Sequence, residues 1–326
     1  MAKVHFLNVG EGDCSIIQSN SGHNTVIDIC NGNQKEEPLE KLARMIAESK
    51  KPKGNFRMCD NLTNPIEYFK NNNITTIFRF ILTHPDMDHM DGLNNIFGNF
   101  SIYNFWDSGV RREKPDFESN NKYDEKDWDI YEDIISGNHQ DLTIISPLAG
   151  DCNKYWCKDD LGGGGDYISI VAPNKDLVDD ATKTGNINDG SYVVVYRSAG
   201  GNIIFAGDSH NKTWEYILDK YKSLVQNAAV LFAPHHGRKS DRDHEFLNIV
   251  NPKVTFFGCA PSKDLDYSAW QNRELLYFTN NQCGNIVLEP HKSKINIFIE
   301  NKSFAVKYTN NNTYTNNQGY YFLEEV

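Results

Sequence analysis

The chain has 326 residues and a formal net charge of −11, and 39% of its residues are hydrophobic. A chain of this length and apolar content can bury a large core. Its acidic balance argues against a broad non-specific nucleic-acid surface, which normally carries clustered Lys and Arg. A metal-assisted phosphate site stays compatible with that charge, because divalent cations invert the local charge. The mean hydropathy is −0.59, and since no apolar run reaches the length of a membrane span, none is predicted.

The N-terminus and the cysteines favour a cytoplasmic protein. The opening sequence MAKVHFLNVGEGD reaches acidic residues without a long apolar stretch, which is not typical of a signal peptide. The seven cysteines are odd in number and scattered, which fits reduced thiols better than a disulfide framework. Cys152 and Cys157 form an isolated C-x₄-C, which by itself is weak evidence for a disulfide or a metal site.

The first part of the chain alternates strand and helix patterns. Short apolar or alternating runs between turn residues predict strands, and apolar residues at helical spacing predict helices. Strands are expected over 3–9, 14–20, 24–30, 75–82 and 101–108, and helices over 38–51, 64–72 and 91–100.

Residues 111–166 differ from what precedes them. They are charged, hold one predicted helix over 127–136, and end in a glycine run over 162–165. The run lacks the Gly-Lys-Ser/Thr of a phosphate loop, so a flexible hinge is the expected use. We interpret 111–166 as an elaboration of a single domain that spans 1–326, with a short polar C-terminal tail.

The second part of the chain repeats strands and helices regularly. Strands are expected over 167–173, 191–198, 202–208, 228–234, 253–260, 285–290 and 294–300, and helices over 211–226, 241–250 and 272–281. The last two strands read as a hairpin-like pair. Two sheets packed between helices satisfy this order, so the predicted fold is an α/β sandwich of four layers, αββα.

Histidines and aspartates gather where predicted strands stop. In the motif THPDMDHMDG, His84, Asp86 and Asp88 alternate and share one face of an extended segment, while His89 can point back to a second ion. One such residue alone is commonly structural, for example as a helix N-cap, but the whole set is typical of a site for two divalent ions. The predicted ligands are His84, Asp86, Asp88, His89, Asp208, His235 and His236, with Asp208 as the bridge and the choice between the last two left open.

These motifs resemble the metallo-β-lactamase superfamily, and within it the hydrolase domain of DNA-uptake competence proteins (ComEC-like). The matching stretches are FLNVGEGD with Asp13, VIDIC with Asp28, THPDMDHMDG, NDGSYVVV, AGDSH and APHHG, over roughly residues 4–290. The resemblance implies a metallo-β-lactamase sandwich and a metal-dependent hydrolase. The membrane-spanning parts of the uptake proteins have no counterpart here, so a DNA channel is not expected.

The chain departs from the family pattern in three places. Asp86 stands where many members have a second His, and only His139 lies between the first motif and Asp208, so Asn188 or Asp189 is a candidate for the missing ligand. The Asn-x-Tyr-x-His stretch of the uptake group is replaced by KDLDYSAW. The candidates for substrate contacts are Asn188, Asp189, Ser191, Arg238 and Lys239, and a solvated loop is an equal alternative for the last two.

The predicted function is a phosphodiesterase or nuclease that uses two divalent ions, Zn or Mn, and a bridging hydroxide, with Asp88 and Asp208 as catalytic residues. The extra carboxylate of Asp86 favours Mn²⁺ alongside Zn²⁺ and phosphoryl oxygens over amide carbonyls. Nucleic acid or another phosphodiester is the expected substrate. Two alternatives are hydrolysis of a small phosphodiester of the phosphorylcholine or nucleotide type, and a metal-bound scaffold that binds a protein partner through 111–166.

Overall fold

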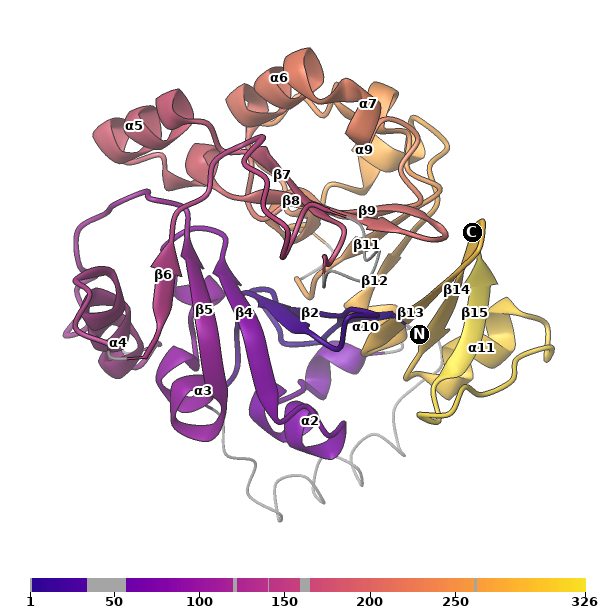
Figure 1. Cartoon of the computed structure of the whole chain (residues 1–326). Coiled ribbons are helices and arrows are strands. Elements are labelled where there is room, and N and C mark those ends of the chain that lie inside the picture. Colours follow the sequence, from indigo (N-terminus) through magenta and orange to yellow (C-terminus); the bar gives the residue numbers. More distant parts are fainter. Residues whose placement is uncertain (1, 34–56, 120–121, 140, 159–164, 261–262) are drawn as a thin grey trace.

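The computed structural model describes residues 2–33, 57–119, 122–139, 141–158, 165–260 and 263–326, and two sheets face each other in it (Figure 1). The larger, nine-stranded sheet has the order β15-β14-β13-β1-β2-β3-β4-β5-β6. Its strands are β1 (Lys3–Phe6), β2 (Ser15–Gln18), β3 (Asn24–Ile27), β4 (Thr76–Leu82), β5 (Ser101–Asp107), β6 (Thr143–Ile145), β13 (Ile286–His291), β14 (Lys294–Ile299) and β15 (Tyr321–Glu325).

The smaller, six-stranded sheet has the order β12-β11-β10-β9-β8-β7. Its strands are β7 (Ile168–Ala172), β8 (Val193–Ser198), β9 (Gly201–Phe205), β10 (Val230–Phe232), β11 (Val254–Phe257) and β12 (Tyr277–Thr279). Strands β9 to β12 run parallel, whereas β7 and β8 pair antiparallel at one side.

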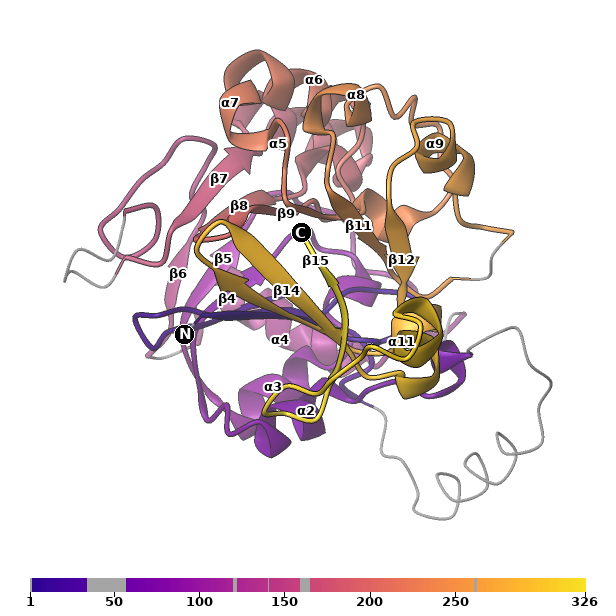
Figure 2. The same cartoon turned by 90° about the vertical axis from the view of Figure 1, so that its right-hand side faces the viewer.

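Helices cover the outer face of each sheet (Figures 1 and 2). The helices are α2 (Pro65–Asn71), α3 (Leu93–Asn99), α4 (Glu125–Ile135), α5 (Lys175–Thr184), α6 (Asn211–Lys220), α7 (Lys222–Val225), α8 (Leu247–Val250), α9 (Tyr267–Gln271), α10 (Asn280–Cys283) and α11 (Lys302–Tyr308). Short 3₁₀ turns are η1 (Met58–Asp60), η2 (Met87–His89), η3 (Ile187–Gly190) and η4 (Pro234–Gly237).

Three apolar layers hold this arrangement together. One cluster of buried side chains lies between the sheets and draws on both, with Phe6 and Trp106 from one and Phe205 and Phe256 from the other. A second cluster packs α2, α3 and α4 on the larger sheet, and a third packs α6, α8 and α9 on the smaller sheet. The predicted four-layer αββα sandwich is therefore confirmed.

The strand directions place the site. Strands β3, β4 and β5 run parallel in the larger sheet, and β9, β10 and β11 run parallel in the smaller one. The carboxyl ends of parallel neighbours lie at one edge of a sheet, so the residues that follow them gather there. Two backbone hydrogen bonds connect these ends, from Tyr192 N to Thr83 O at 2.9 Å and from His235 N to Gly207 O at 2.9 Å.

Most of the predicted elements in the described residues form, and three differ. The stretch 272–281 is not a helix: β12 lies in it and pairs with β11, because this pairing buries Phe278 between the sheets. The helix predicted over 211–226 is divided at Tyr221 into α6 and α7, and that over 241–250 is reduced to α8. The helix predicted over 38–51 and residues 162–164 of the glycine run lie outside the described residues.

Both the elaboration and the tail join the larger sheet. Within 111–166, α4 confirms the predicted helix, and β6 adds a parallel edge strand to β5. Near its end the buried Asp166 forms an ion pair with the buried Arg79 of β4 at 3.1 Å. The predicted hairpin of β13 and β14 is confirmed, and the aromatic end of the tail forms β15 against β14. None of the helices in the described ranges has both the length and the apolar character that crossing a bilayer requires.

The preference for reduced thiols is wrong for four cysteines, and the alternative of a Cys152–Cys157 disulfide is confirmed. Disulfides join Cys59 to Cys259 and Cys152 to Cys157, whereas Cys14, Cys30 and Cys283 are free and buried. The first bridge connects η1 to the end of β11, two segments 200 residues apart, and sequence spacing gives no sign of such a pair.

Loss of the long-range bridge is expected to destabilise the fold. Since the bridge closes a loop of 200 residues, replacement of both Cys59 and Cys259 by serine should lower the free energy of unfolding by about 2–5 kcal/mol. Urea unfolding of the two proteins measures this difference. The matched control replaces both Cys152 and Cys157 by serine. Because the bridge that it removes closes a loop of only 5 residues, it should change stability less. Equal stability of all three proteins under oxidising conditions would contradict the bridge.

Candidate metal centre

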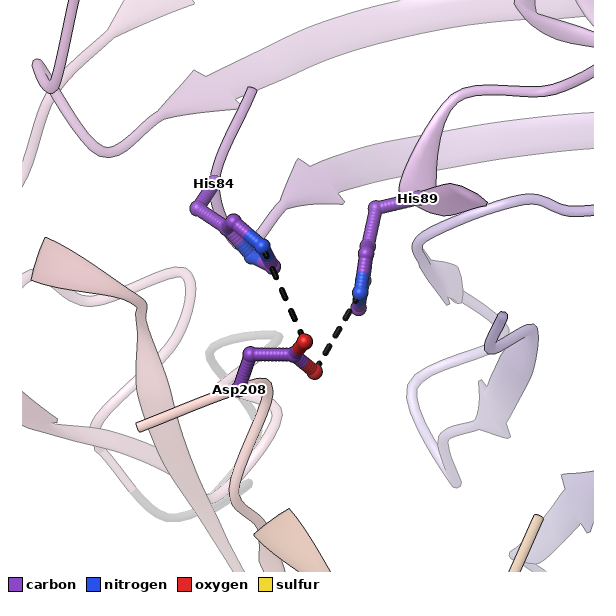
Figure 3. A group of neighbouring side chains, drawn as sticks. All are labelled: His84, His89 and Asp208. Carbon is purple, nitrogen blue, oxygen red and sulfur yellow. Dashed lines mark ion pairs between the residues drawn. The ribbon is translucent and has the colours of Figure 1, made fainter. Parts of the chain in front are cut away.

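The carboxylate of Asp208 lies among four histidines. It follows β9, and its Oδ1 atom lies 3.2 Å from Nε2 of His89 and 3.5 Å from Nε2 of His236. The other oxygen, Oδ2, lies 4.0 Å from Nε2 of His84 and 3.7 Å from Nε2 of His235. Figure 3 shows His84 and His89 converging on this carboxylate from the loop after β4. The two oxygens therefore face two different pairs of imidazoles, which is the arrangement of a bridging ligand.

Asp88 lies beside the pair of histidines, His89 and His236, that faces Oδ1 of Asp208. Its Oδ1 lies 3.9 Å from Nε2 of His89, and its Oδ2 lies 3.7 Å from Nε2 of His236. The ligand atoms of Asp88, His89 and His236 lie within 4.8 Å of one another, and so do those of His84, His89 and Asp208. Both groups could hold a metal ion, and they share His89.

Three of the histidines are oriented from behind. His89 Nδ1 lies 2.8 Å from Oδ2 of Asp28, and His236 Nδ1 lies 3.0 Å from Oδ1 of Asp13. His84 Nδ1 lies 3.1 Å from the hydroxyl of Thr83. Hydrogen bonds at Nδ1 of His84 and His89, and the ion-pair contact at Nδ1 of His236, hold the rings with Nε2 toward the centre, as is usual for metal-binding histidines.

The atoms that face the centre have no hydrogen-bond partner. Within the described ranges, these unpartnered buried atoms are Nε2 of His84, His89 and His236 and Oδ1 of Asp208. A buried polar atom without a partner costs free energy, so several of them around one point require an explanation. Imidazole nitrogens and carboxylate oxygens are ligands of Zn²⁺ and related ions, so the residues present fit a metal centre.

The four histidines around Asp208 differ in protonation state. Burial lowers the pKa of His84 and of His235 to about 4, so both are neutral and can offer a lone pair. Burial also disfavours charge on His89 and His236, but nearby carboxylates outweigh it. Asp208 and Asp28 raise the pKa of His89 well above its usual range, and Asp13 and Asp208 raise that of His236 to about 10.

Metal binding is therefore expected to release protons. Because their pKa values are raised, His89 and His236 are each imidazolium ions near neutral pH in the metal-free protein. A metal ion that binds at Nε2 must displace the proton on that nitrogen. Loading with Zn²⁺ near pH 7 should release about two protons per chain, and the apparent affinity should fall as the pH falls. Calorimetry in buffers of different ionisation enthalpy measures the number. His236→Gln should release about one proton fewer, and a binding enthalpy independent of the buffer would contradict the prediction.

Close packing explains two glycine motifs. Gly12 of GEGD lies against the chain after β4, where a Cβ atom would come 1.7 Å from the carbonyl oxygen of Asp88. This approach places Asp13 beside His236. In the HHG motif, His235 and His236 have left-handed φ values of 54° and 58°, and a Cβ on Gly237 would come 2.7 Å from the Phe257 ring. Such strained backbone occurs where a site needs a particular side-chain direction.

The structure brings together six of the seven predicted ligands. Asp86 is the exception: its side chain is 41% exposed and forms an ion pair with Arg112 at 2.8 Å. His235 lies near the same Asp208 oxygen as His84, whereas Asn188 and Asp189 belong to none of the groups among the described residues that could hold a metal ion. Both lie in η3, where Asp189 is buried and accepts a hydrogen bond from Asn186 at 2.7 Å.

The remaining predicted substrate contacts lie at different depths. Ser191 is buried beside Gly207, and its hydroxyl has no partner within the described residues. The guanidinium of Arg238 donates to the carbonyl oxygen of Glu11 at 3.2 Å, at the rim of the centre. Lys239 lies in an exposed loop and donates to the carbonyl oxygen of Lys263 at 2.8 Å. A solvated loop was the alternative to a substrate contact for this residue.

Sequence reasoning gave no role to several residues that shape the site. Asp13 and Asp28 were visible only as motif positions, and Thr83 only as a neighbour of His84. Arg242 carried no signal, since it lies 34 residues after Asp208. It is buried and donates to the carbonyl oxygens of Asp208 at 2.9 Å and of Ser209 at 2.8 Å, and burial lowers its pKa to about 10. This buried cation fixes the loop that carries the Asp208 carboxylate.

Comparison with known proteins gives structural neighbours. No family model and no curated protein sequence matches the chain. Igni18, a metallo hydrolase from the archaeon Ignicoccus hospitalis, is similar at 13% identity and a TM-score of 0.45, over 89% of this chain and 100% of its own. A diphosphatase of the PhnP family is similar at 13% identity and a TM-score of 0.43, over 90% of this chain and 99% of its own.

Tm1679, a metal-dependent hydrolase of the β-lactamase superfamily, is similar at 14% identity and a TM-score of 0.41, over 89% of this chain and 99% of its own. At such identities and TM-scores the likeness says nothing about what this chain acts on, so its function has to be inferred from its own residues.

Proposed function

We propose that this protein is a metal-dependent phosphodiesterase that binds two divalent ions, Zn²⁺ or Mn²⁺, and cleaves nucleic acid. The observation that carries the proposal is the set of unpartnered, buried ligand atoms around Asp208. In this proposal, His84 and His235 would hold one ion, and Asp88, His89 and His236 would hold the other. Asp208, whose two oxygens face these two groups, would be a ligand of both ions.

The chemistry of the site supports a phosphoryl rather than an amide substrate. Bound divalent ions at such a centre polarise a phosphoryl oxygen and provide a nucleophile from water near neutral pH. The chain supplies two carboxylates, Asp88 and Asp208, which suit hard ions and oxygen ligands. The sequence motifs that resemble DNA-uptake hydrolases support nucleic acid as the substrate.

The protein's own groups prepare the centre. Burial of His84, His89 and His236 excludes water from the protein side of the site. Asp28 and Asp13 hold the rings of His89 and His236 in place, and Arg242 fixes the backbone of Asp208. These contacts keep the ligands in one geometry before the substrate arrives, which is where most of the rate enhancement of such sites originates.

A substrate panel tests the proposal. Purified protein with Mn²⁺ or Zn²⁺ is incubated with single- and double-stranded DNA, RNA, bis(p-nitrophenyl) phosphate and a β-lactam. We expect cleavage of the model phosphodiester and of at least one nucleic acid, no turnover after treatment with EDTA, and recovery when the metal is restored. Affinity for the polymer should be modest and fall with salt, because the net charge of −11 leaves few cations to displace counterions.

Each outcome of the panel has one reading. Asp208→Ala protein, purified in the same way, shows how much activity comes from contaminating nucleases. Cleavage of the model ester but of no nucleic acid would replace the polymer with a small phosphodiester. Turnover of the lactam alone would overturn the phosphodiesterase, and inactivity on all substrates with two ions bound would favour a scaffold that binds a partner.

A further inference from the structure

Asp86 lies differently from the rest of its motif. His84 and His89 are fully buried and Asp88 is mostly buried, whereas the Asp86 side chain is 41% exposed. Its Oδ1 atom accepts hydrogen bonds from the backbone N–H of Met87 at 2.9 Å and from Nη1 of Arg112 at 2.8 Å. Among the described residues, it belongs to none of the groups that could hold a metal ion.

The partner of Asp86 is held in place by its own segment. Arg112 follows β5 at the start of the elaboration, after the fully buried Val110. Val110 packs against α5 and η3 so tightly that a Cβ atom on Gly190 would come 2.2 Å from its side chain. Arg111 adds an ion pair with Asp107 at 2.7 Å. The backbone that presents Arg112 is therefore fixed against α5, η3 and the end of β5.

The Arg112 guanidinium has N–H donors that no described residue uses. A guanidinium has five N–H donors in a fixed fork, and Asp86 engages only Nη1. In the described part of the chain, the group has no second hydrogen-bond partner, and the side chain is 29% exposed. The Asp86 N–H donates to the carbonyl oxygen of His84 at 2.9 Å, so the chain turns back tightly here. Asp86 lies between His84 and Asp88 in the motif, so the guanidinium that it binds lies next to the segment that carries these two ligands.

A positive charge at this place complements the substrate and the carboxylates of the centre. The centre gathers the carboxylates of Asp13, Asp28, Asp88 and Asp208, and a phosphodiester brings a further negative charge. The planar fork of arginine matches two phosphate oxygens, which a lysine does not. An arginine that is anchored by its backbone and oriented by one carboxylate loses little entropy when it binds a phosphate.

We propose that Arg112 binds the phosphoryl group of the substrate, and that Asp86 is a positioning residue that orients Arg112 rather than a ligand of the metal. The inference rests on the proposed phosphodiesterase function. With this role for Arg112, the elaboration becomes part of the active site. Asp86, which stands where many members of the resembled family have a metal-binding histidine, then contributes to recognition of the substrate's charge instead of to metal binding.

Measurement of metal content shows whether Asp86 is a positioning residue or a metal ligand. With Zn²⁺ in excess and subsequent removal of free ions, Asp86→Asn and Arg112→Gln should each retain the wild-type content, measured by elemental analysis. Were Asp86 a ligand, Asp86→Asn should lose about one of two equivalents. His84→Ala, which removes a proposed ligand, shows that the measurement detects such a loss. Loss of metal in Asp86→Asn alone overturns the positioning role.

Phosphate binding and kinetics test Arg112. Calorimetry with inorganic phosphate should give a dissociation constant about 10- to 100-fold weaker for Arg112→Gln than for wild type, since a hydrogen bond to a charged group is lost. The KM for bis(p-nitrophenyl) phosphate should rise with it, and Arg112→Lys should recover part of the loss. Asp86→Asn should weaken phosphate binding less, and should have no further effect in the Arg112→Gln background.

Lys114 provides the matched control. It lies two residues further along the same segment, but its Nζ contacts Glu125 and Asp129 of α4 at 2.8 Å each. Lys114→Gln should leave phosphate binding and KM unchanged. Equal phosphate binding by wild type and Arg112→Gln, in protein that cleaves the model ester, overturns the role of Arg112. Absence of cleavage by wild type is a different result, since it contradicts the phosphodiesterase function itself.

Discussion

Replacement of Asp208 by alanine is expected to abolish hydrolysis of bis(p-nitrophenyl) phosphate and to remove both metal ions. Its two oxygens face different pairs of histidines, His89 with His236 and His84 with His235. A change at this one residue therefore damages both halves of the centre. Turnover should fall at least about 1000-fold, since several kcal/mol of charge stabilisation in the transition state are lost. Metal content, measured by elemental analysis, should fall from about two equivalents to less than half an equivalent.

Single histidine variants are expected to have smaller effects on metal content. His84→Ala should empty mainly the site that His235 shares, and His236→Ala mainly the site of Asp88 and His89. Asp241→Ala is a matched control for Asp208→Ala, because Asp241 is an exposed aspartate in the loop that follows the HHG motif. It should retain turnover and metal. If Asp208→Ala keeps wild-type turnover, or loses one ion while the other stays, the bridging assignment is wrong.

Replacement of Asp28 by alanine is expected to weaken metal binding and to destabilise the fold. The Asp28 carboxylate is buried and accepts three hydrogen bonds, from the Thr83 N–H at 2.7 Å, the Thr83 hydroxyl at 2.7 Å and His89 Nδ1 at 2.8 Å. Its loss leaves buried donors without a partner, at a cost of about 1–3 kcal/mol each. It also releases the His89 ring, and loss of such an orienting contact typically costs about 10- to 100-fold in metal affinity.

Urea unfolding of metal-free protein and calorimetric titration with Zn²⁺ measure these two effects separately. Asp13→Ala is the informative comparison, since Asp13 orients His236 in the same way but is less buried. It should weaken metal binding to a similar degree and change stability less. Unchanged metal affinity in both variants would mean that the two carboxylates do not orient the ligands.

The positions of the site residues along the chain could be predicted because they depend on local pattern. An apolar strand that ends in THPDMDH places ligands at a sheet edge wherever that strand lies, and the same holds for AGD and PHHG. The alternation of strands and helices was likewise enough for the αββα sandwich. The run LLYFT shows the limit: its apolar residues suit a helix or a strand, and the free position beside β11 decided for β12.

The partners of the site residues could not be predicted, because they join segments far apart in the chain. The sequence shows Asp86 and Asp88 as equivalent carboxylates, but the anchored Arg112 holds one at the surface while Gly12 and His236 enclose the other. It shows His235 and His236 as a doublet, but two left-handed residues send them to opposite oxygens of Asp208. The bridge of Cys59 with Cys259 belongs to the same class.

By itself, then, the sequence determined the layered fold, the strand ends at which the candidate ligands gather, and the histidines and carboxylates that make up this candidate set. These depend on periodicity and residue type, which act over a few neighbouring positions. Only the tertiary structure decided which ligand faces which oxygen of Asp208, which carboxylates stand behind the histidines, and that Arg112 reaches Asp86. These depend on how two sheets and their loops pack, and packing brings together residues whose separation in sequence carries no information about contact.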